Sequence, residues 1–240
     1  MAKKLRIDKV LSNVGHGSRA EIKRYCKYGV ITVNGEVVNN PGLQVDPEND
    51  EIIFDGELVN YREFVYIMLN KPDGYISATF DKFDPIVLDL IDPLYLAFEP
   101  FPVGRLDKDT EGLLVLTNDG KLSHRVLSPK KHVPKTYYAK IEGVVTEEDI
   151  KAFKEGVVLD DGYETMPAQL EILKSDEISE IELTIHEGKF HQVKRMFESV
   201  GKKVVYLKRL SMGKLKLDET LALGEYRELT EEEVKLIEER

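Results

Sequence analysis

The stretch FPVGRLDKDTEGLLVLTNDG, residues 101–120, places four charged side chains directly before a strongly apolar run. The helix and strand breakers Pro102 and Gly104 predict a loop, and residues 112–117 predict a buried strand. The charged set is Arg105, Asp107, Lys108 and Asp109. A carboxylate at the lip of a buried strand, flanked by bases, can stay ionised. Such a group could be a nucleophile, a base or a metal ligand, and the loop could equally be a salt-bridged structural one.

Around this stretch the chain alternates strand patterns with isolated helices. Strands are predicted over 64–69, 135–141, 169–173, 181–185 and 204–207. Helices are predicted over 121–127, 146–153 and 192–200, with a last acidic helix capped by Thr230 and Glu233. The order has no βαβ rhythm, so we predict an α+β fold.

The first 60 residues form a separate pattern. Ile7, Val10, Leu11 and Val14 recur at helical spacing. A second helix is predicted between the Ser18 capping residue and Gly29, a hairpin at Asn34-Gly35 and a short strand near 51–54. The second helix carries four basic residues, Arg19, Lys23, Arg24 and Lys27. The polar residues 60–63 are the predicted linker.

The charge of the chain is distributed in blocks. The net charge of −10 opposes binding to nucleic acid as an average over the chain. Residues 1–30, however, hold eight Lys or Arg against two acids, and residues 186–216 hold nine against two. Residues 121–140 hold six bases and no acid, whereas residues 31–60 hold seven acids and no base. The blocks predict a basic face on an acidic body, although scattered charge would also fit.

Composition excludes several classes of protein. The single cysteine, Cys26, excludes an internal disulfide and a cysteine-built zinc site. No run of about 18 apolar residues is present, and the start lacks the apolar stretch of a secretion signal. We therefore expect a cytoplasmic protein with no membrane partner.

Two resemblances to known families extend these predictions. The two helices and hairpin of residues 1–60 resemble the S4 RNA-binding domain, which implies RNA binding through the basic helix. The segments Gly104-Arg-Leu-Asp107 and Thr110-Glu-Gly-Leu-Leu114 resemble the signature of pseudouridine synthases, specifically the ribosomal small-subunit synthase A family. Residues 70–74, 135–138 and 187–197 resemble further motifs of that family in the expected order. The resemblance implies an S4-like domain over 1–60 and a catalytic domain over 61–240 with a mainly antiparallel mixed sheet.

The same resemblance implies roles for individual residues. Asp107 would be the catalytic nucleophile, Arg105 would help to hold the flipped nucleotide, and Tyr137 would pack on the target base. Lys194 would pair with the catalytic aspartate, although a lysine lacks the bidentate fork of an arginine. His191 and Gln192 could contact RNA, while a histidine with a purely structural role at a helix start fits equally well.

The implied reaction isomerises one uridine of bacterial 16S rRNA to pseudouridine without a cofactor or metal. The target of the family lies in the 5′ part of 16S rRNA and would be uridine 516 in standard bacterial rRNA numbering. The expected partner is 16S rRNA or a small-subunit assembly intermediate, with no obligate protein partner and a monomeric enzyme. Three alternatives remain open: a 23S rRNA synthase, a non-catalytic S4-domain assembly factor, and a carboxylate–metal hydrolase built on Asp107 and Asp109.

Overall fold

The computed structural model describes residues 4–239, and these fall into two compact units. The first unit extends to Val65 and includes Asp92–Pro100, and the second contains Tyr66–Ile91 and the chain from Phe101 onward. The segment 92–100, which forms the short helix α3 (Pro93–Leu96), therefore groups with the N-terminal unit although it follows the first strand of the second. The domain boundary after residue 60 stays a prediction.

The first unit begins with the two predicted helices, α1 (Ile7–Asn13) and α2 (Arg19–Tyr28). The backbone N–H of Glu21 donates to the Ser18 hydroxyl, and the Glu21 carboxylate accepts from the Ser18 N–H at 2.8 Å, which completes the predicted capping box. Gly29 ends α2 in the left-handed conformation, with φ 70°. The predicted helix bounds are therefore confirmed.

A small sheet completes this unit. Strands β2 (Ile31–Val33) and β3 (Glu36–Val37) form the predicted hairpin, because Asn34 and Gly35 both adopt positive φ. Strands β5 (Ile52–Phe54) and β6 (Glu57–Leu58) extend it in the order β3-β2-β5-β6, and β1 (Leu5–Arg6) pairs with β4 (Gln44–Val45) separately. The apolar faces of both helices pack on this sheet around Ile22, Ile31 and Ile52.

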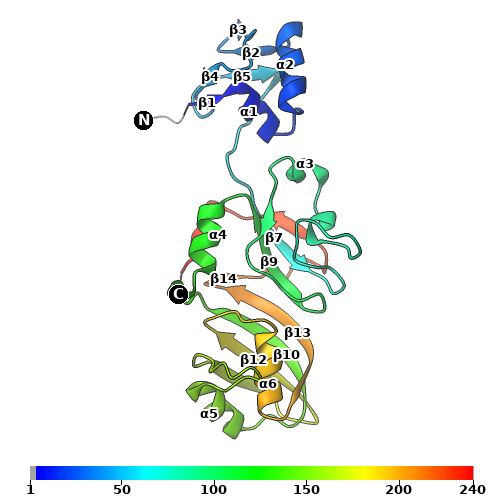
Figure 1. Cartoon of the computed structure of the whole chain (residues 1–240), viewed down its shortest axis with the longest axis vertical. Helices are drawn as coiled ribbons and strands as arrows, with labels where there is room; N and C mark the ends of the chain where they lie inside the picture. The colour runs from blue at the N-terminus through cyan, green and yellow to red at the C-terminus, as the bar shows by residue number, and fades with distance from the viewer. Residues whose placement is uncertain (1–3, 240) are drawn as a thin grey trace. The chain divides into compact units, whose positions relative to one another are not determined.

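The second unit is built on one large sheet, which Figure 1 shows in the lower part of the drawing. Seven strands lie in the order β11-β12-β10-β13-β9-β7-β15, with β14 on β13 and β8 on β9. Only β9 and β13 run parallel among these pairs. The mixed, mainly antiparallel sheet and the α+β fold are confirmed. The strands are β7 (Tyr66–Lys71), β8 (Phe101–Pro102), β9 (Glu111–Thr117), β10 (Lys135–Glu142), β11 (Gln169–Lys174), β12 (Ile178–Ile185), β13 (Lys203–Met212), β14 (Leu215–Lys216) and β15 (Tyr226–Glu228).

Helices cover parts of this sheet. They are α4 (Gly120–Leu127), α5 (Glu147–Glu155), α6 (Gln192–Ser199) and α7 (Glu231–Leu236), with the 3-10 turns η1 (Val87–Leu90) and η2 (Pro129–Lys131). Phe153 of α5 and Phe197 of α6 are fully buried and meet edge to face at 5.0 Å between ring centroids. This contact fixes the C-terminal half of α6, whose other end points at the charged loop described below.

Some predicted bounds were wrong. The strand predicted over 204–207 is longer in the structure, where β13 has ten residues. Both of its edges pair with other strands, and this pairing holds polar residues in the strand that their polarity alone did not predict to be there. The first strand of the sheet begins at Tyr66 rather than at residue 64. None of the helices within residues 4–239 is long and apolar enough to cross a membrane.

Candidate active site

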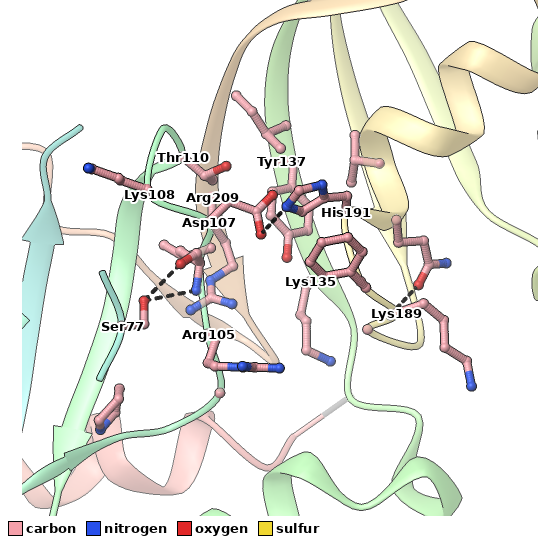
Figure 2. A pocket seen from close by; sticks show the side chains of 18 of the residues that line it. Ser77, Arg105, Asp107, Lys108, Thr110, Lys135, Tyr137, Lys189, His191 and Arg209 are labelled. Carbon is pink, nitrogen blue, oxygen red and sulfur yellow. Dashed lines mark hydrogen bonds and ion pairs between the residues drawn. The ribbon is translucent and has the colours of Figure 1, made fainter. Parts of the chain in front are cut away.

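The loop that contains Asp107 is anchored on both sides. On the N-terminal side, the Ser77 hydroxyl accepts the Leu106 N–H at 3.0 Å and donates to the Leu106 carbonyl at 2.9 Å. One side chain thus satisfies both backbone groups of the residue before Asp107. Figure 2 shows these two bonds as dashed lines beside Ser77. On the C-terminal side, the Thr110 N–H donates to the Asp107 carbonyl at 3.0 Å, which closes a tight turn.

Lys71 holds the far end of the same loop. Its Nζ donates to the carbonyls of Pro72, Lys108 and Thr110 at 3.0, 3.1 and 2.8 Å. The side chain is fully buried, and burial lowers its pKa to about 8 against the opposing pull of nearby carboxylates. Three carbonyls therefore share one buried ammonium, and the carboxylate of Asp107 sits on a rigid support. The sequence pattern gave no sign of this function of Lys71, although the residue lies in the motif at 70–74.

Helix α6 supplies the groups that contact the Asp107 carboxylate. His191 Nε2 lies 3.6 Å from Oδ1, and Lys194 Nζ lies 3.3 Å from Oδ2. His191 adopts φ 48° at the position that precedes the helix, so the residue and Lys194, three positions on, reach the same acid. Lys194 lies next to Asp107, as the sequence predicts, whereas the contact between His191 and Asp107 was not predicted.

Lys194 also binds a second carboxylate. Its Nζ lies 2.6 Å from Asp109 Oδ1. Burial raises the pKa of Asp109, but the hydrogen bond and charge of Lys194 outweigh it and hold that pKa below its usual value. Burial likewise opposes the charged form of Lys194, while the two carboxylates raise its pKa overall. The side chain of Lys194 is 19% exposed and that of Asp109 is 65% exposed, so the ammonium is the shielded member of the cluster.

The Asp107 carboxylate borders a pocket of about 730 Å³, within the usual range for ligand sites. Tyr137 of β10 lines it and is 8% exposed, whereas Phe190, stacked on His191 at 3.7 Å between centroids, is 72% exposed. Figure 2 places Tyr137 next to Asp107 and His191. The described residues lining the pocket include five Lys or Arg side chains, Arg105, Lys108, Lys135, Lys189 and Arg209, and a single carboxylate.

Two of these cations are shielded from solvent to different degrees, and no local sequence pattern indicated either of them. Arg209 of β13 is 2% exposed, and Lys135 of β10 is partly buried. Burial first, and then the charge of Arg209, lower the pKa of Lys135 to about 8. The strand that carries Arg209 comes very close to β9, where a Cβ on Gly112 would lie 2.3 Å from the Arg209 carbonyl oxygen. Gly112 therefore permits the pairing that brings Arg209 to the pocket.

The remaining predicted site residues lie in different settings. Arg105 is exposed at the edge of the pocket. Gln192 lines the pocket but its amide is engaged, since Oε1 accepts the Lys189 N–H at 2.9 Å and Nε2 donates to Glu187 Oε1 at 2.8 Å. An RNA contact by Gln192 stays a prediction. The four basic residues of α2, Arg19, Lys23, Arg24 and Lys27, are all exposed and belong to the other unit.

The metal alternative rests on weak geometry. Asp107 and Asp109 lie in a turn rather than on a strand, so the shared strand face assumed for a metal site was wrong. Both carboxylates contact the Lys194 ammonium, which occupies the position that a shared metal ion would need. Within residues 4–239, no cluster of three or more His, Cys, Asp or Glu side chains could hold a metal ion.

Comparisons with known proteins agree with this geometry. Residues 65–199 match the RNA pseudouridylate synthase family, and residues 5–52 match the S4 domain. The chain belongs to the RNA pseudouridylate synthase family. It is 53% identical to an uncharacterised RNA pseudouridine synthase of Bacillus subtilis (strain 168), over 98% of this chain and 99% of the relative. It is 42% identical to ribosomal small subunit pseudouridine synthase A of Escherichia coli (strain K12), over 96% and 98% of the two chains.

A solved structure supports the same assignment. A crystal structure of a pseudouridylate synthase superposes with a TM-score of 0.68 at 40% identity, covering 97% of this chain and 99% of that chain. The resemblance to pseudouridine synthases inferred from residues 104–114 is confirmed, and so is the S4 domain. This pseudouridine synthase therefore carries an S4 domain and a synthase region in one chain.

Proposed function

We propose that this pseudouridine synthase isomerises a single uridine of bacterial 16S rRNA, uridine 516 in standard numbering, with Asp107 as the nucleophile. The observation that carries the assignment of Asp107 is its setting. Its loop is held by Ser77 and Lys71, and one carboxylate oxygen faces His191 while the other faces Lys194. A rigidly held carboxylate at the edge of a pocket suits attack on a sugar or a base.

The reaction needs the uridine outside its base stack. Flipping a nucleotide costs a few kcal/mol in a paired region and less in a loop. Tyr137, at the pocket wall beside Asp107, offers an aromatic face on which the flipped base could pack. Arg105 at the exposed edge could hold the nucleotide or fill the gap it leaves. The uracil freed from C1′ must turn and rejoin through C5, and a pocket that limits water suits that step.

Lys194 has two functions in this mechanism. Its ammonium, 3.3 Å from Asp107 Oδ2, balances the negative charge of that carboxylate, and its bridge to Asp109 fixes the lysine side chain in place. Asp109 thereby becomes a positioning group for Lys194, and we place it outside direct contact with RNA. His191, whose Nε2 lies 3.6 Å from Oδ1, would orient the other carboxylate oxygen.

The substrate assignment has separate support. Relatives named ribosomal small subunit pseudouridine synthase A align with almost the whole chain at about 42% identity. The S4 domain carries exposed cations on α2, and cations of this kind bind phosphates. We infer that 16S rRNA or a small-subunit assembly intermediate is the substrate, that the enzyme works as a monomer in the cytoplasm, and that it needs no cofactor.

The deciding experiment maps pseudouridine across unmodified 16S and 23S rRNA, free and in assembly intermediates, after incubation with the purified full chain. We expect one new site, at uridine 516 of 16S rRNA. The Asp107→Asn variant should abolish that site while it retains RNA affinity, because the amide is isosteric but cannot act as the nucleophile. Asp84→Asn, which changes an exposed acid paired with Lys108 outside the pocket lining, is the matched control and should leave the site intact.

Each other outcome overturns a definite part of the proposal. A site in 23S rRNA would retain the chemistry and refute the substrate. Turnover by Asp107→Asn near the wild-type rate would refute the nucleophile. Tight RNA binding without any new site would favour an assembly factor that binds RNA and does not modify it.

A further inference from the structure

Arg209 is a buried cation that the assignments above leave without a function. Its Nε donates to the Leu113 carbonyl at 2.8 Å, which holds the base of the guanidinium. Its Nη2 is buried and has no hydrogen-bond partner among residues 4–239. A buried N–H left unpaired costs about 1–3 kcal/mol, and more when the group is charged. The Thr110 hydroxyl, also buried and lining the pocket, is unpaired in the same way.

The charges around Arg209 make its setting more costly still. Neither Arg209 nor Lys135 forms an ion pair within the described part of the chain. Burial lowers the pKa of Lys135, and the charge of Arg209 lowers it further. The single carboxylate of the pocket lining, Asp107, is already shared by Lys194 and His191. A buried cation without a partner is costly, and a charged group of this kind that lines a cleft is a candidate for contact with a ligand.

The depth of the guanidinium indicates which part of the substrate it meets. The cations at the edge of the pocket, Arg105, Lys108 and Lys189, are exposed and suit the phosphates of the RNA backbone. Arg209 lies instead with the buried residues of the pocket, Leu106, Thr110 and Tyr137, and Figure 2 shows it on the Asp107 side of the pocket. A flipped nucleotide inserts its base to this depth and leaves its phosphates at the edge.

The reaction creates an anion at this depth. As a carboxylate oxygen of Asp107 bonds to C1′, the N1–C1′ bond breaks, its electron pair stays with the uracil, and the negative charge spreads over the ring and its two carbonyl oxygens. C5 then bonds to C1′ while the bond from C1′ to Asp107 breaks and returns its electron pair to the carboxylate. C5 gives up its proton and N1 takes one up, so no oxidant or reductant is required. We propose that Arg209 contacts the target base directly, with Nη2 donating to a uracil carbonyl oxygen and stabilising the detached uracil anion. The proposal rests on the pseudouridine synthase reaction and does not depend on which rRNA carries the target.

The proposal predicts a particular kinetic pattern for Arg209→Gln. At saturating RNA the single-turnover rate of glycosidic cleavage should fall about 100-fold, the usual effect of removing a donor to a developing anion. The dissociation constant for RNA should change less than about twofold. With 5-fluorouridine at the target position the defect should shrink to less than about tenfold, because the fluorine itself stabilises the uracil anion. Arg209→Lys keeps the positive charge but loses the two-pronged guanidinium. Its single-turnover cleavage rate should lie between those of the wild type and Arg209→Gln.

Controls separate this role from a structural one. Arg125→Gln removes an exposed arginine of α4 that pairs with Glu238 and lies outside the pocket lining. This variant should leave the cleavage rate unchanged on both uridine and 5-fluorouridine RNA. Equal defects on uridine and 5-fluorouridine would show that Arg209 acts only on structure, and a weakened affinity with an unchanged rate would indicate a phosphate contact. Either result overturns the proposal.

A structure of the wild-type enzyme covers the case in which Arg209 variants fail to fold. In a crystal with RNA that carries 5-fluorouridine at the target, Nη2 should lie within hydrogen-bonding distance, about 3 Å, of a uracil oxygen. A base seated in the pocket with Nη2 still unpaired would refute the contact. If mapping places the modified uridine in an RNA other than 16S rRNA, the substrate proposal has failed, and the Arg209 proposal is tested on that RNA.

Discussion

The cations of helix α2 and those of the candidate active-site pocket carry the same charge in opposite settings. Lys23 and Lys27 are exposed on α2, where water and salt screen them and where they interact with any phosphate in reach. Arg209, Lys135 and Lys194 are shielded, so their charge acts strongly over a short distance and only on what enters the pocket. Exposed cations therefore suit binding, and buried ones suit chemistry. The four predictions below test that distinction.

The largest effect is expected from the shielded Lys194. Lys194→Met removes the ammonium that lies 3.3 Å from Asp107 and 2.6 Å from Asp109, and deprives both carboxylates of this cation. Single-turnover activity should fall about 100-fold with RNA affinity retained, since the loss concerns groups at the reacting centre. Lys194→Arg should recover most of the activity. The control is Lys214→Met, which removes an exposed lysine paired with Glu239. A comparable loss of activity in this variant would contradict the distinction between shielded and exposed cations.

Gly112→Ala should disturb the strand pairing that delivers Arg209. The added Cβ would lie 2.3 Å from the Arg209 carbonyl oxygen at a residue with φ +100°, and backbone atoms have no room to yield. We expect the free energy of unfolding to drop by about 3 kcal/mol in chemical denaturation. Gly120→Ala, with open space around its Cβ position, should change it by less than about 1 kcal/mol. Equal effects of the two substitutions would show that the close approach is unimportant.

The pH dependence of turnover should reveal the buried lysines. Burial lowers the pKa of Lys135 to about 8, so the side chain is protonated below that pH and neutral above it. The pocket holds its full positive charge only on the acid side, and turnover at saturating RNA should fall as the pH rises through about 8. Lys135→Arg stays charged and should keep its activity to higher pH. An unchanged fall in that variant would assign it to Lys71, whose pKa is also about 8.

The smallest effect is expected from the exposed cations. Replacing Lys23 and Lys27 together by Ala should weaken RNA binding about fivefold near physiological salt and lower the salt slope by about 2, with turnover at saturating RNA unchanged. The matched control replaces Lys151 and Lys154, exposed lysines of α5 in the second unit. A loss of turnover at saturating RNA in the α2 variant would show that these cations do more than bind.

Local patterns predicted a large part of this protein because local physics decides those parts. The capping box at Ser18 and the turn at Asn34-Gly35 specify their own hydrogen bonds and positive φ angles, and both form as expected. The apolar run at 112–117 predicted its buried strand for the same reason. The charged group at 105–109 and its resemblance to a known signature identified Asp107, Tyr137 and Lys194 as candidates, and the fold brings all three to one pocket region.

Other features depend on residues far apart in the chain. Lys71 and Ser77 hold the Asp107 loop across intervals of more than 25 residues, and only the packed sheet brings them together. Arg209 was hidden in a segment that looked like a short strand with a charged tail, because its burial depends on β13 lying between β10 and β9. His191 was ambiguous until the backbone before α6 turned it toward Asp107.

The sequence alone determined the helix caps, the hairpin, the family and the candidate nucleophile, since short-range spacing and side-chain chemistry encode them. Only the tertiary structure decided which cations are buried, which backbone carbonyls they hold and which of their N–H groups are left without a hydrogen-bond partner. Burial changes the energy of a charge by several kcal/mol, and burial is a property of the assembled sheet and helices rather than of any one segment.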